Sequence, residues 1–411
     1  MTGRLPWQLA STAQLAAAHP CPSGGGPDVP GALIGVDQHG APFCFDAFAL
    51  YAARRLTNPN MLVVGEIGAG KSALVKTLLW RQQAFGHAAW VADPKGEYGP
   101  LAAASGVTPI RLDPAGGARL NPFDNDDHTT PAQHGPLLAA LAATAAGRPL
   151  RPTEHAAADV ALTAAARRGP LLLPAVVDAL LDPAEPDAAG LHLSVDRLAD
   201  EGRDVALALR RLCRGDLAGL FDGPTTVRPR HDDPLVVLDL SAIYQRARDA
   251  LPLAMTCATA WLQHAVTAAT APHRYVVLDE AWALLAHLDT ARWLQQSTKL
   301  ARARGVAHLI VLHRLSDLTA AGDAHSETVA LARGVLSDTG VRALYHQPHS
   351  ELAAAATLLG LSDAEAAILP HLDPTIGLWL IGDAHQLVAH RLAPAERPIV
   401  DTDDRMIGDT A

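Results

Sequence analysis

The residues GEIGAGKS at positions 65–72 constrain this chain more than any other feature of its sequence. They fit the pattern GxxxxGK[ST], in which glycines let a loop curl so that successive backbone N–H groups point at phosphate oxygens. The apolar residues Met61–Val64 before the loop predict a strand, and the residues from Lys71 to about Phe85 predict a helix. The pattern therefore predicts a strand, a phosphate-binding loop and a helix in direct succession.

The start of the predicted helix adds a partial positive charge to this loop. We expect Lys71 to reach the β- and γ-phosphates of ATP, and the Ser72 hydroxyl to complete the shell of a Mg²⁺ ion. The alternative, a chance glycine turn before a helix, leaves the complete motif and its two flanks unexplained. The predicted nucleotide-binding residues are Gly65, Glu66, Ile67, Gly68, Ala69, Gly70, Lys71, Ser72 and Ala73.

A second apolar strand, Tyr275–Leu278, ends in two carboxylates, Asp279 and Glu280. In phosphate-loop proteins an Asp at this place holds Mg²⁺. Glu280 is placed to orient and deprotonate an attacking water, which favours a hydrolase over a small-molecule kinase. The alternative is that both carboxylates cap the helix that follows, because acids suit helix N-termini. The complete phosphate loop favours the first interpretation.

Two further segments carry candidate residues with open alternatives. Asp93, Lys95 and Glu97 follow the predicted strand Ala88–Val91, where ligands bind in parallel sheets, but Asp, Pro and Gly also form ordinary turns. His313 and Arg314 follow the strand Leu309–Leu312, at the place of a γ-phosphate sensor if this strand neighbours Tyr275–Leu278; a surface pair is the alternative.

An arginine finger, which enters a neighbouring subunit's site, is harder to assign from sequence. Arg342 on the predicted strand Val341–His346 is the candidate for this role in catalysis. Three other arginines are candidates for the same role: Arg302, Arg304 and Arg333. For each of the candidates, the alternative is an ordinary surface arginine.

Composition excludes several classes of protein. The formal charge of −10, from 33 basic and 43 acidic residues, argues against a protein that coats nucleic acid through a broad basic surface. Four cysteines without a CxxC pair make a disulfide framework or a zinc site unexpected, and the 19 histidines show no HExxH pattern. These patterns predict no metal site other than one for Mg²⁺. The apolar run Leu137–Ala146 is shorter than the ~20 residues that span a bilayer, which predicts a soluble chain.

Alternating strands and helices predict an α/β fold with a mostly parallel sheet, interrupted by an all-α insertion. The predicted parts are a flexible arm (1–30), a first core segment (31–125), a helical insertion (126–228), a second core segment (229–400) and an acidic tail (401–411). Within the first segment, Ala32–Val36 and Pro42–Phe45 predict a hairpin, and Val107–Leu112 a strand. The strands Leu378–Ile381 and Gln386–His390 predict a closing hairpin.

Taken in order, several motifs resemble the conjugation and type IV secretion ATPases of the FtsK/HerA branch of phosphate-loop proteins. They are the phosphate loop, Ala92–Tyr98, Arg119–Asp124, Leu278–Trp282 and Leu315–Leu318. The actinobacterial form is the most similar, on the evidence of Thr57–Asn60, Leu220–Thr225 and Asp401–Met406.

The resemblance implies a RecA-like ATPase core, an insertion that acts as a lid, and a homo-hexameric ring. It also implies a cytoplasmic protein, peripheral at the inner face of the membrane, with proteins of a transfer complex as partners. The sequence departs from the family twice: the segment before Gly65 is short where many relatives carry a large N-terminal domain, and His313-Arg314 replaces the usual Thr-Gln. The sensor role of that Gln would then fall to Arg314.

The sequence thus predicts a Mg²⁺-dependent ATPase that is a motor of a conjugative or type IV secretion apparatus and drives assembly or substrate transfer. One alternative is a DNA-translocating ATPase of the same branch, although the net charge does not indicate DNA binding. An alternative of another class is an ATP-gated scaffold that hydrolyses slowly and recruits partners.

Overall fold

The computed structural model describes residues 26–124, 130–230, 232–265, 272–301, 304–319 and 327–401. Most of the predicted flexible arm, the start of the predicted insertion, the competing Arg302 and the predicted tail after Asp401 lie outside these ranges.

A single sheet of 11 strands forms the centre of the described part of the chain, in the order β2-β1-β11-β10-β9-β3-β8-β7-β4-β6-β5. The strands from β9 to β5 in this order pair in parallel, whereas β2, β1, β11 and β10 are joined to each other and to β9 by antiparallel pairing. The strands are β1 (Ala32–Asp37), β2 (Pro42–Phe45), β3 (Met61–Val64), β4 (Ala88–Asp93), β5 (Ile110–Arg111), β6 (Leu235–Asp239), β7 (Arg274–Leu278), β8 (Val306–Leu312), β9 (Val341–Leu344), β10 (Ile376–Ile381) and β11 (Ala384–His390).

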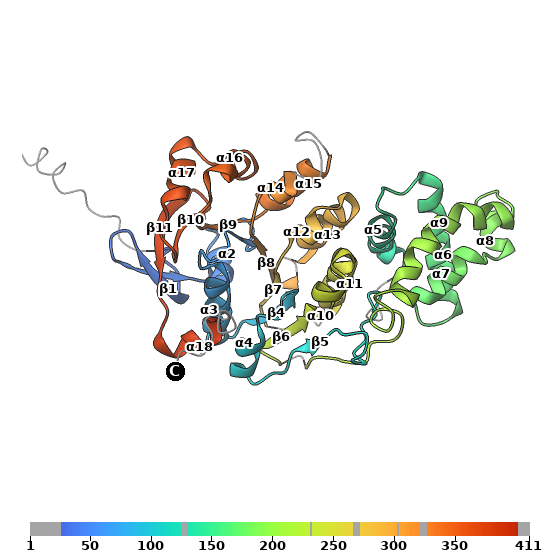
Figure 1. Ribbon diagram of the computed structural model, residues 1–411, viewed down its shortest axis with the longest axis horizontal. Helices are drawn as coiled ribbons and strands as arrows, with labels where there is room; N and C mark the ends of the chain where they lie inside the picture. The colour runs from blue at the N-terminus through green and yellow to red at the C-terminus, as the bar shows by residue number, and fades with distance from the viewer. Residues whose placement is uncertain are drawn as a thin grey trace, which may run out of the picture.

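The middle strands are buried on both faces, which explains their unbroken apolar sequence. In β3, Met61 and Val63 join one hydrophobic cluster, while Leu62 and Val64 join the cluster on the opposite face. Helices therefore cover the sheet on both sides, and the predicted α/β fold with a mostly parallel sheet is confirmed (Figure 1).

One face of the sheet packs against helices that follow the first strands and against a short helix at the end of the described chain, and the other against helices from between β6 and β10 (Figure 1). The first group is α2 (Ala47–Ala52), α3 (Lys71–Gln83), α4 (Gly99–Ala104) and α18 (Arg397–Val400). The second group includes α10 (Ser241–Arg246), α11 (Leu251–Ala265), α12 (Trp282–Leu285), α13 (Leu288–Ala301), α14 (Ser316–Thr319), α15 (Glu327–Ser337) and α16 (Leu352–Leu359); α17 (Asp363–Ile368) follows α16.

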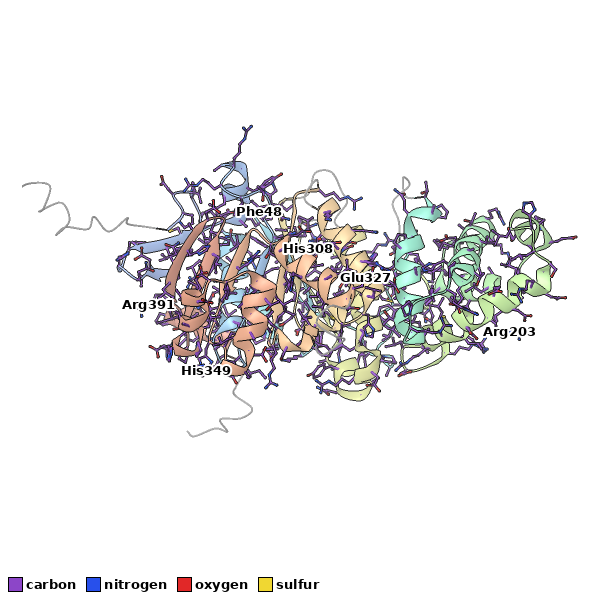
Figure 2. All side chains as sticks on the ribbon, turned by 90° about the horizontal axis from the view of Figure 1, so that it is seen from above. Phe48, Arg203, His308, Glu327, His349 and Arg391 are labelled. Atoms are coloured by element: carbon purple, nitrogen blue, oxygen red, sulfur yellow. The ribbon has the colours of Figure 1, made fainter. Side chains whose placement is uncertain are left out.

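The helices between β5 and β6 project away from the sheet as a bundle (Figure 1). They are α5 (Gly135–Ala146), α6 (Pro152–Arg168), α7 (Leu173–Leu181), α8 (Glu185–Gly190) and α9 (Val195–Arg214). Helix α5 packs against α11 and α13 of the core, so it connects the bundle to the sheet-covering helices. In Figure 2, Arg203 of the bundle and Arg391 beyond β11 lie at opposite ends of the molecule.

A hydrogen-bonded neck joins the insertion to the core. Its entry segment, Arg119–Asn121, runs beside its exit segment: Leu120 N donates to Leu220 O at 2.8 Å, and Arg119 N to Thr226 Oγ1 at 2.9 Å. Asn121 N donates to Thr225 Oγ1 at 2.8 Å. The two ends of the helical bundle are therefore adjacent in space.

The sequence expectations for individual elements mostly agree with the structure. Both predicted hairpins are present, as β1–β2 and β10–β11. The predicted strand Val107–Leu112 is wrong in length, because only Ile110–Arg111 pairs, and it does so at the edge of the sheet. Val107 N instead donates to Ala102 O at the end of α4, and Pro109 has no N–H to donate.

Among the described residues, no single helix is long and apolar enough to cross a membrane. The pair α6 and α7, bent by 118° between them, passes on length and composition alone.

Candidate nucleotide-binding and catalytic site

The loop after β3 has a backbone that its glycines make possible. Gly68 and Gly70 have φ angles of +82° and +98°, in the left-handed region where side chains are strained. A Cβ on Gly65 would lie 2.5 Å from the Cβ of Tyr345, whose N–H donates to Val64 O at the end of β3. The loop thus passes closely over the neighbouring strand β9 and leads directly into α3.

Lys71, the first residue of α3, is buried in this loop. Its Nζ donates to the carbonyl oxygen of Glu66 at 2.8 Å, so the ammonium group lies against the loop with which it is expected to bind phosphate. The pKa of Lys71 is lowered to about 8, because burial and the charge of Lys95 lower it by more than Asp279 raises it. This ammonium group therefore lies among both positive and negative neighbours.

The sheet order β3-β8-β7-β4 brings four strand ends together at one edge. The phosphate loop follows β3, His313 follows β8, Asp279 follows β7 and Lys95 follows β4. Strand β8 lies between β3 and β7, so it neighbours the strand that carries the two carboxylates, as the sensor interpretation required. Residues far apart in the sequence therefore share one site.

Asp279 is a carboxylate placed where ionisation is unfavourable. It is buried, and burial raises its pKa to about 6, with further contributions from Glu280 and Asp93. A buried carboxylate with acidic neighbours is stabilised by a bound cation. Its position beside the phosphate loop is therefore suited to a divalent metal ion.

Glu280 is fixed by contacts from three directions. Its Oε2 accepts a 2.6 Å hydrogen bond from Trp282 Nε1, its Oε1 lies 2.7 Å from His313 Nε2, and Lys95 Nζ forms an ion pair with the same Oε1. Its backbone is left-handed, with φ of +55°, and its N–H donates to Asp279 Oδ1 at 3.0 Å. Although burial raises its pKa, the hydrogen bonds and charges of His313 and Lys95 outweigh burial and lower it to about 2.

Asp93 organises the turn that presents Lys95. Its Oδ1 accepts N–H groups from Lys95 at 3.2 Å and from Gly96 at 2.8 Å, and its Oδ2 accepts Tyr98 N at 2.9 Å. Asp93 therefore has the turn-forming role that the sequence left open. Of this segment, the Lys95 side chain contacts the proposed catalytic carboxylate.

The predicted sensor pair is divided by the structure. The side chain of His313 lies against Glu280 and 3.0 Å from Lys95 Nζ, whereas Arg314 is exposed. Direct contact with Glu280 thus comes from the histidine, one residue before the arginine that the family pattern selected. The sensor role of Arg314 stays a prediction.

Arg342, the predicted finger, contacts its own chain. Its guanidinium donates to Leu359 O at 2.7 Å from strand β9, and burial lowers its pKa. Arg304 and Arg333 are exposed. A role for any of them in a neighbouring subunit stays a prediction.

Two features of this site were not predicted. Trp282 donates a hydrogen bond to the Glu280 carboxylate. The only signal for this contact in the sequence is that Trp282 lies two residues after Glu280. Thr375 N donates to Ala69 O of the phosphate loop at 3.3 Å, with φ of +77°. No local pattern connects Thr375 with a loop three hundred residues earlier.

The donors at this edge fit a Mg²⁺ ion, which prefers carboxylate and hydroxyl oxygens. Asp279 supplies the buried carboxylate, and the half-buried Ser72, the second residue of α3, supplies a hydroxyl. Single ligand atoms of Asp279, Glu280 and His313 also lie within 4.8 Å of one another. The ion pair of Lys95 with Glu280 favours Asp279 and Ser72 as the ligands.

Comparison with known proteins finds likeness in the fold. No protein-family model matches the chain, and no curated protein matches it in sequence. VirB4 of Thermoanaerobacter pseudethanolicus superposes with a TM-score of 0.73 at 22% identity, covering 91% of this chain and 100% of that one. The plasmid coupling protein TrwB in complex with ADP and Mg²⁺ has a TM-score of 0.59 at 14% identity, covering 95% of this chain and 96% of that one.

TrwB has a similar score, 0.58, in its unbound form, at 14% identity over 88% of this chain and 90% of that one. The predicted resemblance to proteins of conjugation and type IV secretion is thus confirmed at the level of the fold. The chain has the fold of VirB4 and of the conjugative coupling protein TrwB.

Proposed function

We propose that this chain is a Mg²⁺-dependent ATPase that serves as a motor of a conjugative or type IV secretion apparatus. The observation that carries the proposal is the convergence of the phosphate loop with Asp279 and Glu280 at one sheet edge. The likeness of the fold to TrwB, solved with ADP and Mg²⁺, supports the same nucleotide and metal here.

The residues have distinct roles in this proposal. Lys71 and the loop amides from Gly65 to Ala73 bind the phosphates, while Ser72 and Asp279 hold Mg²⁺. When bound, the ion neutralises charge on the phosphate oxygens. Glu280 orients the attacking water and accepts its proton; its low pKa keeps the carboxylate ionised, and its contacts fix its orientation.

Assembly into a homo-hexamer and docking on a membrane transfer complex are parts of the same proposal. They are supported by the fold shared with VirB4 and TrwB over nearly the whole chain. In such a ring, Arg314 and Arg342 are the candidate sensor and finger. Driving assembly of the apparatus is favoured over pumping DNA, because the chain carries a formal charge of −10.

The test compares phosphate release from Mg-ATP by the wild type, Glu280→Gln and Lys71→Ala. We expect Glu280→Gln to bind ATP but to lose turnover by about a hundredfold or more, because it lacks the proton acceptor. Lys71→Ala should lose ATP affinity. Glu185→Gln, an exposed carboxylate on α8, is the matched control and should hydrolyse at the wild-type rate. Undiminished hydrolysis by Glu280→Gln would contradict the assignment.

A further inference from the structure

The carboxylate of Glu280 is approached by three donor groups from its own chain. The donors come from three neighbouring strand ends: Trp282 follows β7, His313 follows β8 and Lys95 follows β4. The carboxylate side chain is only 5% exposed. A water that gives its proton to Glu280 needs a lone pair of this carboxylate, and in this arrangement Oε1 is approached by two donors.

The geometry distinguishes the roles of the two groups at Oε1. His313 Nε2 lies 2.7 Å from Oε1 and 3.0 Å from Lys95 Nζ. One imidazole nitrogen cannot donate to the carboxylate and accept from the ammonium group at the same time. Because the contact of Nε2 with Oε1 is the shorter of the two, we assign Nε2–H as a donor to Oε1, with Lys95 donating to the second lone pair of the same oxygen. Lys95 thus occupies an acceptor position of Oε1 and closes it to an attacking water.

Lys95 also lies near Lys71 of the phosphate loop. The charge of Lys95 lowers the pKa of Lys71, so the two ammonium groups lie close enough to interact. A phosphate held by Lys71 is therefore within the electrostatic reach of Lys95. The side chain of Lys95 is 25% exposed, in contrast to the carboxylate it contacts, and its backbone is held by Asp93. The long side chain can move while the turn stays fixed.

We propose that Lys95 is a positioning residue that responds to the terminal phosphate of a bound nucleoside triphosphate. Without that phosphate, Lys95 occupies Oε1 of Glu280; with it, the ammonium group pairs with the phosphate oxygens and releases Oε1 to the water. This inference rests on the proposed ATPase function and adds the residue that links nucleotide occupancy to the proton acceptor.

The step that Lys95 would control is the attack of water on the γ-phosphorus of ATP. Water gives its proton to Oε1 of Glu280 and its oxygen bonds to the γ-phosphorus. The bond from that phosphorus to the β–γ bridging oxygen breaks, and ADP leaves with the electron pair. His313 and Trp282 keep their hydrogen bonds to Glu280 throughout, so the carboxylate keeps its orientation after Lys95 has moved.

The experiment uses the full chain with two probes, Mg-ADP and the non-hydrolysable analogue Mg-ADPNP. Trp282, which bonds Glu280 directly, is the optical reporter, and Trp282→Phe identifies its share of the emission. In the wild type we expect ADPNP, but not ADP, to change the Trp282 emission. In Lys95→Met we expect ADPNP affinity to fall about tenfold or more while ADP affinity stays within about twofold.

Lys299→Met removes an exposed lysine from α13 and is the matched control, which should bind both nucleotides as the wild type does. Lys95→Arg keeps the positive charge and should retain part of the preference for ADPNP. An unchanged ratio of the two affinities in Lys95→Met would overturn the inference, as would equal emission changes with ADP and ADPNP in the wild type. Equal loss of both affinities in Lys95→Met would also overturn it, because Lys95 would then only support the fold.

Failure of the proposed function has a different signature. A wild type that binds neither nucleotide, or a Glu280→Gln variant that hydrolyses normally, contradicts the ATPase assignment itself. A wild type that hydrolyses ATP through Glu280 but shows no response that depends on Lys95 contradicts this inference alone.

Discussion

Nε2 of His313 lies 2.7 Å from Oε1 of Glu280, while the neighbouring Arg314 is exposed. The two residues follow the same strand, β8, but of the two only the histidine reaches the carboxylate of Glu280. The contact with Glu280 is therefore made by His313, whereas the Thr-Gln pattern of the similar proteins assigns the sensor role to the position of Arg314.

Replacing His313 by Asn should therefore lower kcat more than replacing Arg314 by Gln does. Loss of the donor leaves Glu280 less well oriented, which we expect to reduce kcat by about tenfold to a hundredfold. His349→Asn, an exposed histidine, is the control. The measurement is steady-state phosphate release, and a larger loss in Arg314→Gln would restore the arginine as the sensor.

Asp279→Asn should increase stability while abolishing hydrolysis. Because the pKa of Asp279 is raised to about 6, the metal-free fold favours the protonated acid. Ionisation therefore costs nothing below the unfolded pKa near 4, and its full cost is reached above pH 6. Removing the charge should raise the free energy of unfolding at pH 7 by about 1–3 kcal/mol.

This gain should shrink towards zero as the pH falls to about 4, where the wild-type carboxyl is already neutral. Urea unfolding of the metal-free protein at both pH values measures it. Adding Mg²⁺ should stabilise the wild type but not Asp279→Asn, because the variant lacks the metal-binding charge. A variant that is less stable than the wild type at pH 7 would contradict the burial argument.

Gly35→Ala should destabilise the fold by about 1–3 kcal/mol through overpacking. A Cβ on Gly35 would lie 2.0 Å from the carbonyl oxygen of Ala389, a backbone atom of the paired strand β11. Gly190→Ala meets no atom within 4 Å and is the matched control. The midpoint of urea unfolding should fall for the first variant and stay unchanged for the second.

Duplex or single-stranded DNA should not stimulate ATP hydrolysis several-fold. The net charge of −10 gives the chain little general attraction for phosphate backbones. Phosphate release measured with each DNA at low and moderate salt tests this. Strong, salt-sensitive stimulation would instead favour the alternative of a DNA-translocating ATPase.

The local parts of the site could be predicted from sequence because their information is local. The phosphate loop joins β3 to α3 within a dozen residues, and Asp279 follows its strand directly. Scarcity of lysine was a further signal: Lys95 is one of four lysines, and it contacts Glu280. The strand order that brings Lys95 and His313 together is non-local, and no spacing in the chain specifies it.

The direction of each side chain at the end of a strand was also hard to predict from the sequence. Successive side chains of a strand alternate between faces, so an error of one residue exchanges which side chain reaches the site. The expectation for Arg314 came from the Thr-Gln pattern of the family that the sequence resembles, and it stays a prediction; the contact with Glu280 is made by His313, one residue earlier. The shortened strand β5 has a related cause, since an edge strand has one partner and Pro109 interrupts its start.

The hydrogen-bonded neck of the insertion has a consequence for how this chain folds. Strand β5 pairs with β6, yet Ile110 and its partner Leu238 are separated by about 130 residues, a long loop to close. The helices between them make mostly local contacts, which form fast. Once they pack, the neck holds Leu120 beside Leu220, so that about 10 residues on one side and about 18 on the other separate it from the paired residues Ile110 and Leu238. A folded helical bundle thus holds the two chain segments together and favours the pairing of β5 with β6.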